Sequence, residues 1–188
     1  DNSNFNIGGE SPILILGKIY SPIQKEEIQE RIKDIVWFSY RERMPSLLKK
    51  YMPDKSHTSD RGWGCMLRCG QMMVAEVFKR YLIEREIFLP EHKKDSYKAL
   101  LTFFADSVDN GYVSPFSIQQ ISEMAYEEYG LKPGEWYRAS NIIVTLAKLH
   151  KKFATDSLKR LKFVTFVDGT IFEDQILKEA INGYAEKL

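Results

Sequence analysis

The segment that most constrains the fold begins at Cys65 and continues to Leu82, where apolar side chains recur around almost the whole circumference of a predicted helix. They form two adjoining rows, with Met66, Met73, Val77 and Tyr81 in one and Leu67, Val74, Phe78 and Leu82 in the other. So wide an apolar stripe predicts a central helix that is heavily buried. We interpret its Met and aromatic residues as core, because a buried helix is apolar on nearly all sides. The preceding residues, Tyr51–Gly64, are rich in Pro, Asp, Ser, Thr and Gly and predict a loop.

The patterns on either side of this helix predict an α+β domain in which helices dominate. Residues 1–12 are polar and predict a flexible tail, and residues 13–188 are expected to form one part of a domain. Short strands are predicted at Ile13–Leu16 and Phe163–Val167, without the neighbours that a sheet requires. Further helices are predicted from Ser21 to a point before Pro45, over Asp95–Phe104, from Ser117 to Gly130, from Ser140, and over Ile171–Ala180 behind a Thr170–Glu173 capping box. The first of these would carry Trp37, Phe38 and Tyr40 on its last turns.

The composition excludes several classes of protein. The chain has 188 residues, and its 27 Lys and Arg against 26 Asp and Glu give a formal net charge of +1. This balance offers no basic surface for nucleic acid or for an anionic membrane. The apolar runs are far shorter than the roughly 18–20 residues of a spanning helix, so no transmembrane segment is expected. With two cysteines and no signal peptide at its start, the chain is expected in the cytoplasm.

Metal and cofactor sites are also not expected. The two cysteines and three histidines supply no set of ligands at the spacing of a zinc site. The glycines at positions 62, 64 and 70 neither follow a strand nor precede a Lys-Ser or Lys-Thr pair, so a phosphate-binding loop is excluded. The sequence therefore predicts no metal and no cofactor.

Cys65 is the residue that most strongly suggests chemistry. It stands in the first turn of the predicted helix, where unpaired backbone N–H groups and the helix dipole stabilise a thiolate. Gly62 and Gly64 would let another backbone approach the sulfur, and the cation of Arg68, one turn on, would further stabilise the anion. The alternative is that Cys65 is a small buried hydrophobe, as many free cysteines are. The residues alone leave these two interpretations open.

The other cysteine and the histidines supply no clear partner for this thiol. Cys69 lies one turn deeper on the same helix face and is predicted to be core. His57, in the loop before Cys65, is the histidine considered as a base, whereas His92 and His150 sit beside lysines and are predicted to be solvated. A cysteine hydrolase takes its base from a separate element of the fold, so the chain shows a nucleophile without a convincing base.

The string TSDRGWGCMLRCGQM at residues 58–72 closely resembles the active-site segment of the autophagins, the autophagy-related protein 4 family of cysteine peptidases. Further motifs match that family in the same order, namely LGKIY at residues 16–20, WFSYR at 37–41, FSIQQI at 116–121 and GEWY at 134–137. The resemblance extends from about Ile13 to the end of the chain. It departs from the family at Arg138–Asn141, where the family tends towards Gly-Pro-Asn.

This resemblance implies a papain-like fold in which Cys65 attacks the bond after the C-terminal glycine of a ubiquitin-like autophagy modifier. It implies that the hydroxyl of Tyr40 forms an oxyanion hole with the backbone N–H of Cys65. It also implies that Trp136 covers the cysteine and shapes a narrow channel for the glycine. The predicted substrate-binding residues are therefore Trp136, Gly62, Trp63 and Gly64. Without the resemblance, Tyr40 and Trp136 would be interpreted as ordinary core residues.

Two functional hypotheses follow. In the first, the chain is the nucleophile-bearing part of a thiol peptidase that processes modifier precursors and releases lipid-linked modifier, which it reaches peripherally at a membrane. In the second, it is a catalytically incomplete module that binds the modifier without hydrolysis. The family's catalytic Asp-Pro-His motif has no counterpart here, because no Asp-x-His occurs in the chain. The catalytic Asp and His are therefore expected to lie downstream of it.

Overall fold

The computed structural model describes residues 11–83, 93–106, 108–109, 112–156 and 158–185. Most of the tail predicted at residues 1–12 lies outside these ranges, and so does His92. The chain divides into two compact units, residues 1–37 and residues 38–188. The described residues are mostly helical, with two small antiparallel sheets, so the predicted α+β class is confirmed.

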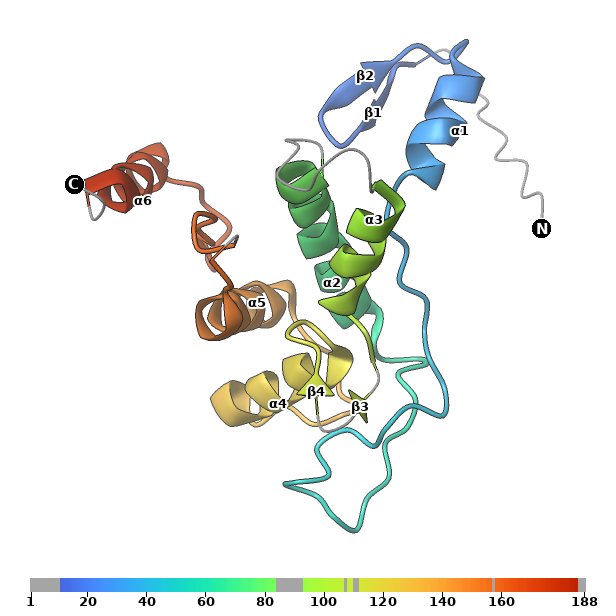
Figure 1. The fold of residues 1–188 in the computed structure, drawn as a ribbon, viewed down its shortest axis with the longest axis vertical. Helices are drawn as coiled ribbons and strands as arrows, with labels where there is room; N and C mark the ends of the chain where they lie inside the picture. Colours follow the sequence, from blue (N-terminus) through green and yellow to red (C-terminus); the bar gives the residue numbers. More distant parts are fainter. Residues whose placement is uncertain (1–10, 84–92, 107, 110–111, 157, 186–188) are drawn as a thin grey trace. The chain divides into compact units, whose positions relative to one another are not determined.

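The first unit consists of a β-hairpin followed by a helix (Figure 1). Strand β1, Ile13–Ile15, pairs antiparallel with β2, Lys18–Tyr20, and Ile15 faces Lys18 across the turn. Leu16 and Gly17 form this turn with φ values of 48° and 87°, as a tight two-residue hairpin requires. The predicted first strand is therefore confirmed, but it has a neighbour that the prediction lacked.

The helix of the first unit, α1, spans Lys25–Lys33 and is much shorter than predicted. Trp37, Phe38 and Tyr40 follow it in irregular backbone, so their predicted position on its last turns is wrong.

The residues after position 40 do not continue a helix because their backbone groups bond to a distant segment instead. The N–H of Met44 donates to the carbonyl of Thr58 at 3.1 Å, and the N–H of Leu47 donates to the carbonyl of His57 at 2.9 Å. These bonds satisfy donors that a helix would otherwise use. They lay residues 41–47 alongside the loop that leads to Cys65.

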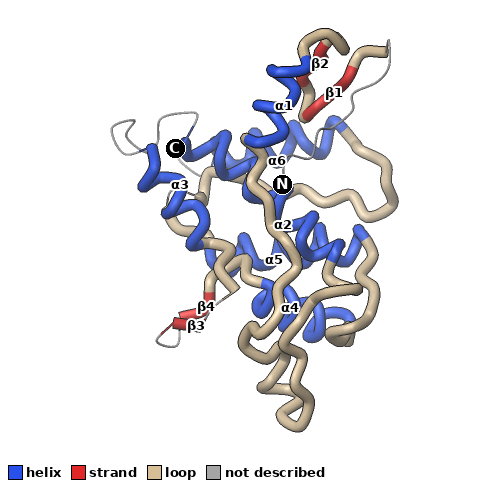
Figure 2. The backbone as a smooth tube through the Cα atoms, turned by 90° about the vertical axis from the view of Figure 1, so that its right-hand side faces the viewer, coloured by secondary structure: helices blue, strands red, loops and turns tan. Residues whose placement is uncertain are grey.

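The second unit contains further helices and a short hairpin (Figure 2). Its described elements are α2 (Cys65–Phe78), the π-helical turn η1 (Lys79–Ile83), α3 (Lys93–Thr102), α4 (Ile118–Tyr129), α5 (Ala139–Phe153), α6 (Glu173–Ala185), and the antiparallel strands β3 (Val108–Asp109) and β4 (Tyr112–Val113). None of the described helices combines the length and apolar character that crossing a bilayer requires.

Local signals predicted the ends of α4 correctly. The hydroxyl of Ser117 accepts a hydrogen bond from the N–H of Gln120 at 3.3 Å, and Gly130 ends the helix with a φ of 68°. The strand predicted at Phe163–Val167 is wrong, since these residues are irregular and no described strand pairs with them. The ring of Phe163 instead stacks on that of His150, with 4.4 Å between centroids.

Aromatic rings form the centre of the core around α2. The ring of Phe78 lies 5.4 Å from that of Phe116 and 5.7 Å from that of Phe103, both edge-on. Phe104 closes the cluster at 5.7 Å from Phe116. Contacts in this geometry add to the stabilisation that comes from burying the rings. They join α2 to the end of α3 and to the segment that precedes α4.

A glycine allows α2 to approach α5 closely. A Cβ added at Gly70 would lie 2.6 Å from Cγ2 of Ile142 and 2.9 Å from Cδ1 of Leu146. Side chains of α5 thus occupy the space that any other residue would need. In Figure 1, α4 and α5 lie side by side, so α2, α4 and α5 form a continuous packed group.

Eight of the fourteen residues of α2 are buried, so the prediction of a heavily buried helix is confirmed, but one narrow face of the helix is exposed. The buried side includes Leu67, Val74, Ala75 and Phe78. On the other side, Met73 is 50% exposed, Val77 is 41% exposed, and Cys69 is also exposed. The prediction that Cys69 is core is therefore wrong, because no described element covers this face. A row of apolar side chains continues from Cys65 along the exposed side of the helix.

Candidate active site

Cys65 is the first residue of α2, as predicted. Gly64 caps the helix, and its carbonyl accepts the first helical hydrogen bond from the N–H of Arg68 at 3.0 Å. The thiol of Cys65 is free and partly exposed. Its backbone N–H belongs to the group of unpaired donors at the positive end of the helix dipole. The position therefore combines access from solvent with the backbone donors at the start of a helix.

The turn in front of Cys65 is closed by the backbone of Asp60. The carbonyl of Asp60 accepts hydrogen bonds from the N–H of Gly64 at 2.8 Å and from that of Trp63 at 3.3 Å. Gly62 has a φ of 85°, and the space around its missing Cβ is open to 4 Å. A Cβ at Gly64 would instead lie 2.6 Å from Cβ of Asp60. The missing side chain therefore matters for a different reason at each glycine: at Gly62 it allows a positive φ, and at Gly64 it leaves room for Asp60. That either glycine contacts substrate stays a prediction.

A buried ion cluster of Asp60, Arg68 and Asp106 lies behind this turn. Arg68 Nε is 2.6 Å from Oδ2 of Asp60, and its Nη1 is 2.5 Å from Oδ2 of Asp106 and 2.9 Å from Oε1 of Gln71. Burial by itself would lower the pKa of Arg68, but the hydrogen bonds and charges of the two carboxylates together raise it. Two carboxylates outnumber one guanidinium, so the cluster carries a formal charge of −1. Arg68 is therefore not the free cation beside Cys65 that the sequence predicted.

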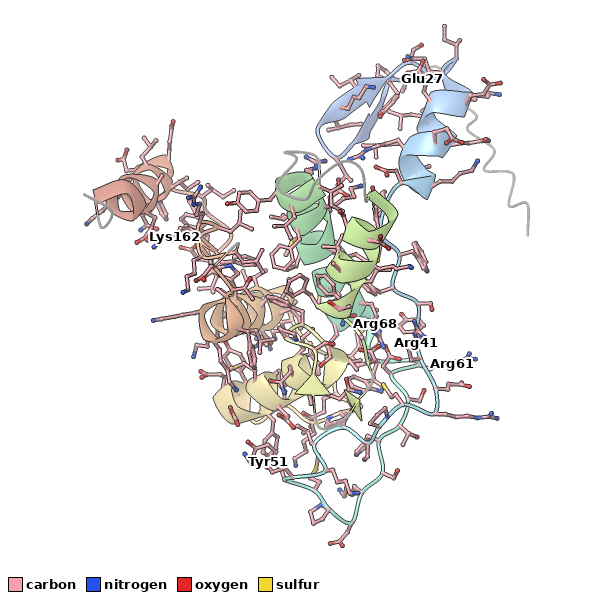
Figure 3. The ribbon with its side chains drawn as sticks, viewed as in Figure 1. Glu27, Arg41, Tyr51, Arg61, Arg68 and Lys162 are labelled. Carbon is pink, nitrogen blue, oxygen red and sulfur yellow. The ribbon has the colours of Figure 1, made fainter. Side chains whose placement is uncertain are left out.

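The same cluster holds the segment that carries Tyr40. The backbone N–H of Arg41 donates to Oδ1 of Asp60 at 2.6 Å, and the N–H of Asp60 donates back to the carbonyl of Arg41 at 3.3 Å. In Figure 3 the labelled side chains of Arg41 and Arg68 lie near the end of α2 at which the helix begins. Tyr40 is partly exposed beside this anchor. Its role in an oxyanion hole stays a prediction.

Trp63 connects the turn to the segment of Trp136. The indole N–H of Trp63 donates to the carbonyl of Ser59 at 3.1 Å, and its ring stacks on that of Tyr137 with 6.1 Å between centroids. Burial raises the pKa of Tyr137 to about 12. Trp63 itself is buried, whereas Trp136, next to Tyr137, is 77% exposed. The side chain of Trp136 is thus available for contact with a ligand, whereas the side chain of Trp63 packs inside the protein.

The histidines do not complete a catalytic pair among the residues that the structure describes. The backbone of His57 is held by the hydroxyl of Ser46, 3.2 Å from its N–H, and no hydrogen bond of its ring is found in the described part of the chain. His150 is only 7% exposed, with Nε2 at 3.2 Å from the carbonyl of Leu158. The prediction of a solvated His150 is therefore wrong. Burial lowers its pKa, against a smaller opposing effect of the Leu158 carbonyl.

Asp60 and Asp106 are the residues that the sequence analysis did not single out. The local sequence does not indicate this role, because Asp60 lies eight residues before Arg68 and contacts it only when the turn before α2 has formed. Across the described ranges, no three His, Cys, Asp or Glu side chains are grouped so that they could hold a metal ion. What the arrangement offers is a thiol, the first backbone N–H of a helix, and a tyrosine segment tied to the same turn.

The chain is similar to a family of peptidases and to several cysteine proteases. The model of the Peptidase C54 catalytic domain matches residues 25–187. Cysteine protease ATG4B of Gallus gallus is 35% identical over 171 residues, which are 89% of this chain and 40% of the relative. Cysteine protease ATG4B of Xenopus laevis is 32% identical over 93% of this chain, and cysteine protease ATG4A of Homo sapiens is 33% identical over 88%. The chain spans about two fifths of the length of these relatives, 39–43%.

Proposed function

Because the chain belongs to the peptidase C54 family, we propose that it carries the nucleophile of a cysteine peptidase and that Cys65 is this nucleophile. The observation that carries the proposal is the position of the free thiol at the first residue of α2. A sulfur anion at this position gains from the unpaired N–H groups of the first turn. The segment of Tyr40 is tied to the turn before Cys65 through the backbone N–H of Arg41, which supports the Tyr40 hydroxyl as a proposed second donor.

The proposed reaction begins when the thiolate of Cys65 attacks the carbonyl carbon of the scissile bond. The carbonyl π electrons move to oxygen, and the backbone N–H of Cys65 and the hydroxyl of Tyr40 stabilise the resulting oxyanion. As the carbonyl re-forms, the C–N bond breaks, the amine leaves with a proton from a general acid, and a thioester remains on Cys65. Water then hydrolyses the thioester and restores the thiol.

The relatives extend beyond the part that this chain matches. We propose that the general acid and base of the reaction correspond to residues in that further part. The exposed row of Cys69, Met73 and Val77 supports this idea, since apolar side chains beside a nucleophile gain stability when a further part of the protein covers them. In this proposal residues 13–188 are the helix-rich portion of a papain-like peptidase domain.

The proposed substrate is a ubiquitin-like autophagy modifier, cleaved after its C-terminal glycine. The exposed indole of Trp136 supports a role beside a narrow glycine channel, and Gly62 and Gly64 leave little side-chain bulk next to the sulfur. The protein is proposed to act in the cytoplasm, on modifier precursors and on modifier linked to lipid at a membrane surface.

A modifier whose C-terminal glycine is replaced by an α,β-unsaturated methyl ester tests the proposal. The thiolate forms a C–S bond at the β carbon and the α carbon takes a proton from water, so the addition needs no leaving group and no general acid from the protein. We expect a covalent adduct at Cys65, its loss in Cys65→Ala, and its retention in Cys69→Ser. Ubiquitin with the same reactive end serves as a control for recognition of the modifier. Binding of the modifier without any adduct would instead show that the chain is a binding module and would contradict the peptidase proposal.

A further inference from the structure

The two donors proposed for the oxyanion hole come from separate segments. The backbone N–H of Cys65 lies at the start of α2, and the hydroxyl of Tyr40 lies on irregular backbone in a segment without helical or strand hydrogen bonds. An oxyanion hole works only when its donors are held in place before the charge develops. Something in the fold must therefore fix these two segments against each other.

Asp60 is in contact with the neighbour of each donor. One carboxylate oxygen, Oδ1, accepts the backbone N–H of Arg41, which follows Tyr40. The backbone carbonyl of the same residue accepts the N–H of Gly64, which precedes Cys65. A Cβ at Gly64 would lie 2.7 Å from Oδ2 of Asp60, so the side chain packs directly on this turn.

The Asp60 side chain is itself held rigidly. It is fully buried, and Arg68 Nε holds Oδ2 at 2.6 Å, a short charge-assisted bond from the first turn of α2. Arg68 is in turn held by Asp106, whose Oδ1 accepts the N–H of Ile118 at the start of α4 at 3.0 Å. Helices α2 and α4, together with the irregular segments of Arg41 and Asp106, therefore determine where the carboxylate lies.

We infer that Asp60 is a positioning residue for the oxyanion hole, which holds the Tyr40 segment against the start of α2 so that both donors point to one place. This inference rests on the proposed function, because it assigns a role within the proposed site. Asp60 touches no substrate, and it acts only through Tyr40 and the turn before Cys65.

The experiment compares two reactions of the Cys65 thiol in the whole chain. Acylation by p-nitrophenyl acetate forms a C–S bond and an oxyanion, and then breaks the C–O bond with release of p-nitrophenolate, which leaves without a proton. Alkylation by iodoacetamide forms a C–S bond and releases iodide without any oxyanion. The ratio of the two rate constants at Cys65 therefore isolates stabilisation of the oxyanion from reactivity of the thiol.

The chain provides an internal reference for this measurement. Trypsin cuts after Arg61 and Arg68, so Cys65 and Cys69 fall on different peptides, residues 62–68 and 69–79. Thiols that remain after each interval are trapped with N-ethylmaleimide, and the trapped fraction is read on each peptide by mass spectrometry. The exposed Cys69 reports the ratio expected for a thiol without an oxyanion hole.

Asp60→Asn replaces one of the two accepting oxygens, which face Arg41 N–H and Arg68 Nε, with a donating NH2 group. We expect it to lower the acylation-to-alkylation ratio at Cys65 by up to about a hundredfold, the loss that a misplacement of about 1 Å can cause in an active site. The matched control is Glu76→Gln, which weakens the ion pairs of this α2 residue with Lys79 and Arg80 in η1, each at 2.9 Å. Glu76 lies about 16 Å along α2 from Cys65, eleven residues at 1.5 Å each. It is expected to lower stability and leave the ratio unchanged.

A double-mutant cycle with Tyr40→Phe separates positioning from general damage. If Asp60 acts through Tyr40, Asp60→Asn has little further effect on the ratio once the hydroxyl is absent. An unchanged ratio in Asp60→Asn, or effects of the two substitutions that simply multiply, would overturn the inference. Arg41→Pro removes the hydrogen bond from the backbone N–H of residue 41 to Oδ1 of Asp60, and must lower the ratio as well if Asp60→Asn fails to fold.

Failure of the proposed function has a different signature. If the ratio at Cys65 in the unmodified chain equals that at Cys69, and Tyr40→Phe does not change it, no oxyanion hole exists and the site itself is wrong. If the unmodified chain and Tyr40→Phe behave as proposed and Asp60→Asn matches the unmodified chain, only the role of Asp60 is wrong.

Discussion

Gly64→Ala is predicted to disrupt the turn before Cys65 through steric overlap with Asp60. The added Cβ would lie 2.6 Å from Cβ of Asp60 and 2.9 Å from its carbonyl oxygen. Asp60 has little room to move, because Arg68 and the N–H of Arg41 hold its two carboxylate oxygens. Overpacking of this kind costs about 1–3 kcal/mol. In a domain of this size each kcal/mol lowers the melting temperature by about 2–4 °C, so we expect a fall of about 2–12 °C.

The neighbouring glycine provides the comparison. Gly62 has a φ of 85° and open space where a Cβ would be, so Gly62→Ala is disfavoured by its backbone conformation alone, at about 1–2 kcal/mol. Gly62→Asn is expected to recover part of this loss, because asparagine tolerates the left-handed region better than alanine. Gly64→Asn keeps the overlap, since its Cβ meets the same atoms, so it is expected to stay less stable than the unmodified chain. Thermal unfolding followed by circular dichroism measures all four variants.

The reasoning about overlap is refuted if Gly64→Ala has the same melting temperature as the unmodified chain. That result would show that the contact between Gly64 and Asp60 relaxes at little cost. The rate of alkylation at Cys65, measured in the same variants, then shows whether the start of α2 moves together with the turn.

Three further outcomes are expected. Burial lowers the pKa of His150, so the unfolded chain binds more protons than the folded chain in acid, and the free energy of unfolding falls as the pH drops below about 6.5. Urea titrations at several pH values should show a weaker fall in His150→Gln. Cys69→Ser should change the free energy of unfolding by less than about 0.5 kcal/mol, because the side chain is exposed, whereas a core cysteine would give a larger loss. Asp106→Ala should cost about 3–5 kcal/mol by leaving Arg68 partly unpaired, while Arg61→Ala, which breaks an exposed ion pair, should cost under about 1 kcal/mol in the same assay.

Features of the fold that depend on a few neighbouring residues could be predicted from the sequence. Cys65 starts α2 after a glycine turn, and Ser117 and Gly130 bound α4, because each of these signals acts within one helical turn. The turn at Leu16–Gly17 is also local, but it lacks the Asn-Gly or Asp-Gly signature of most tight hairpins, so β2 went unpredicted.

Features that depend on distant partners could not be predicted. The apolar spacing after α1 suggested more helix, yet the backbone after Tyr40 bonds to residues 10 to 19 positions further on, from Arg41 with Asp60 to Leu47 with His57. Charged neighbours suggested a solvated His150, but Leu158 and Phe163 fold back over its ring. In each case the hydrogen-bonding group is satisfied by a residue that lies outside the local sequence pattern.

The Gly-Trp-Gly-Cys string shows how one local motif can contain several unrelated constraints. Both glycines suggested room for a substrate, but Gly64 is required by Asp60 within the protein, and only Gly62 borders open space. Trp63, between them, points into the fold and stacks on Tyr137. A spacing rule cannot separate these roles, because each is set by a different tertiary partner. Gly62 is exposed and Cys65 is partly exposed, whereas Trp63 and Gly64 are buried, so four consecutive residues of one string lie in two different environments.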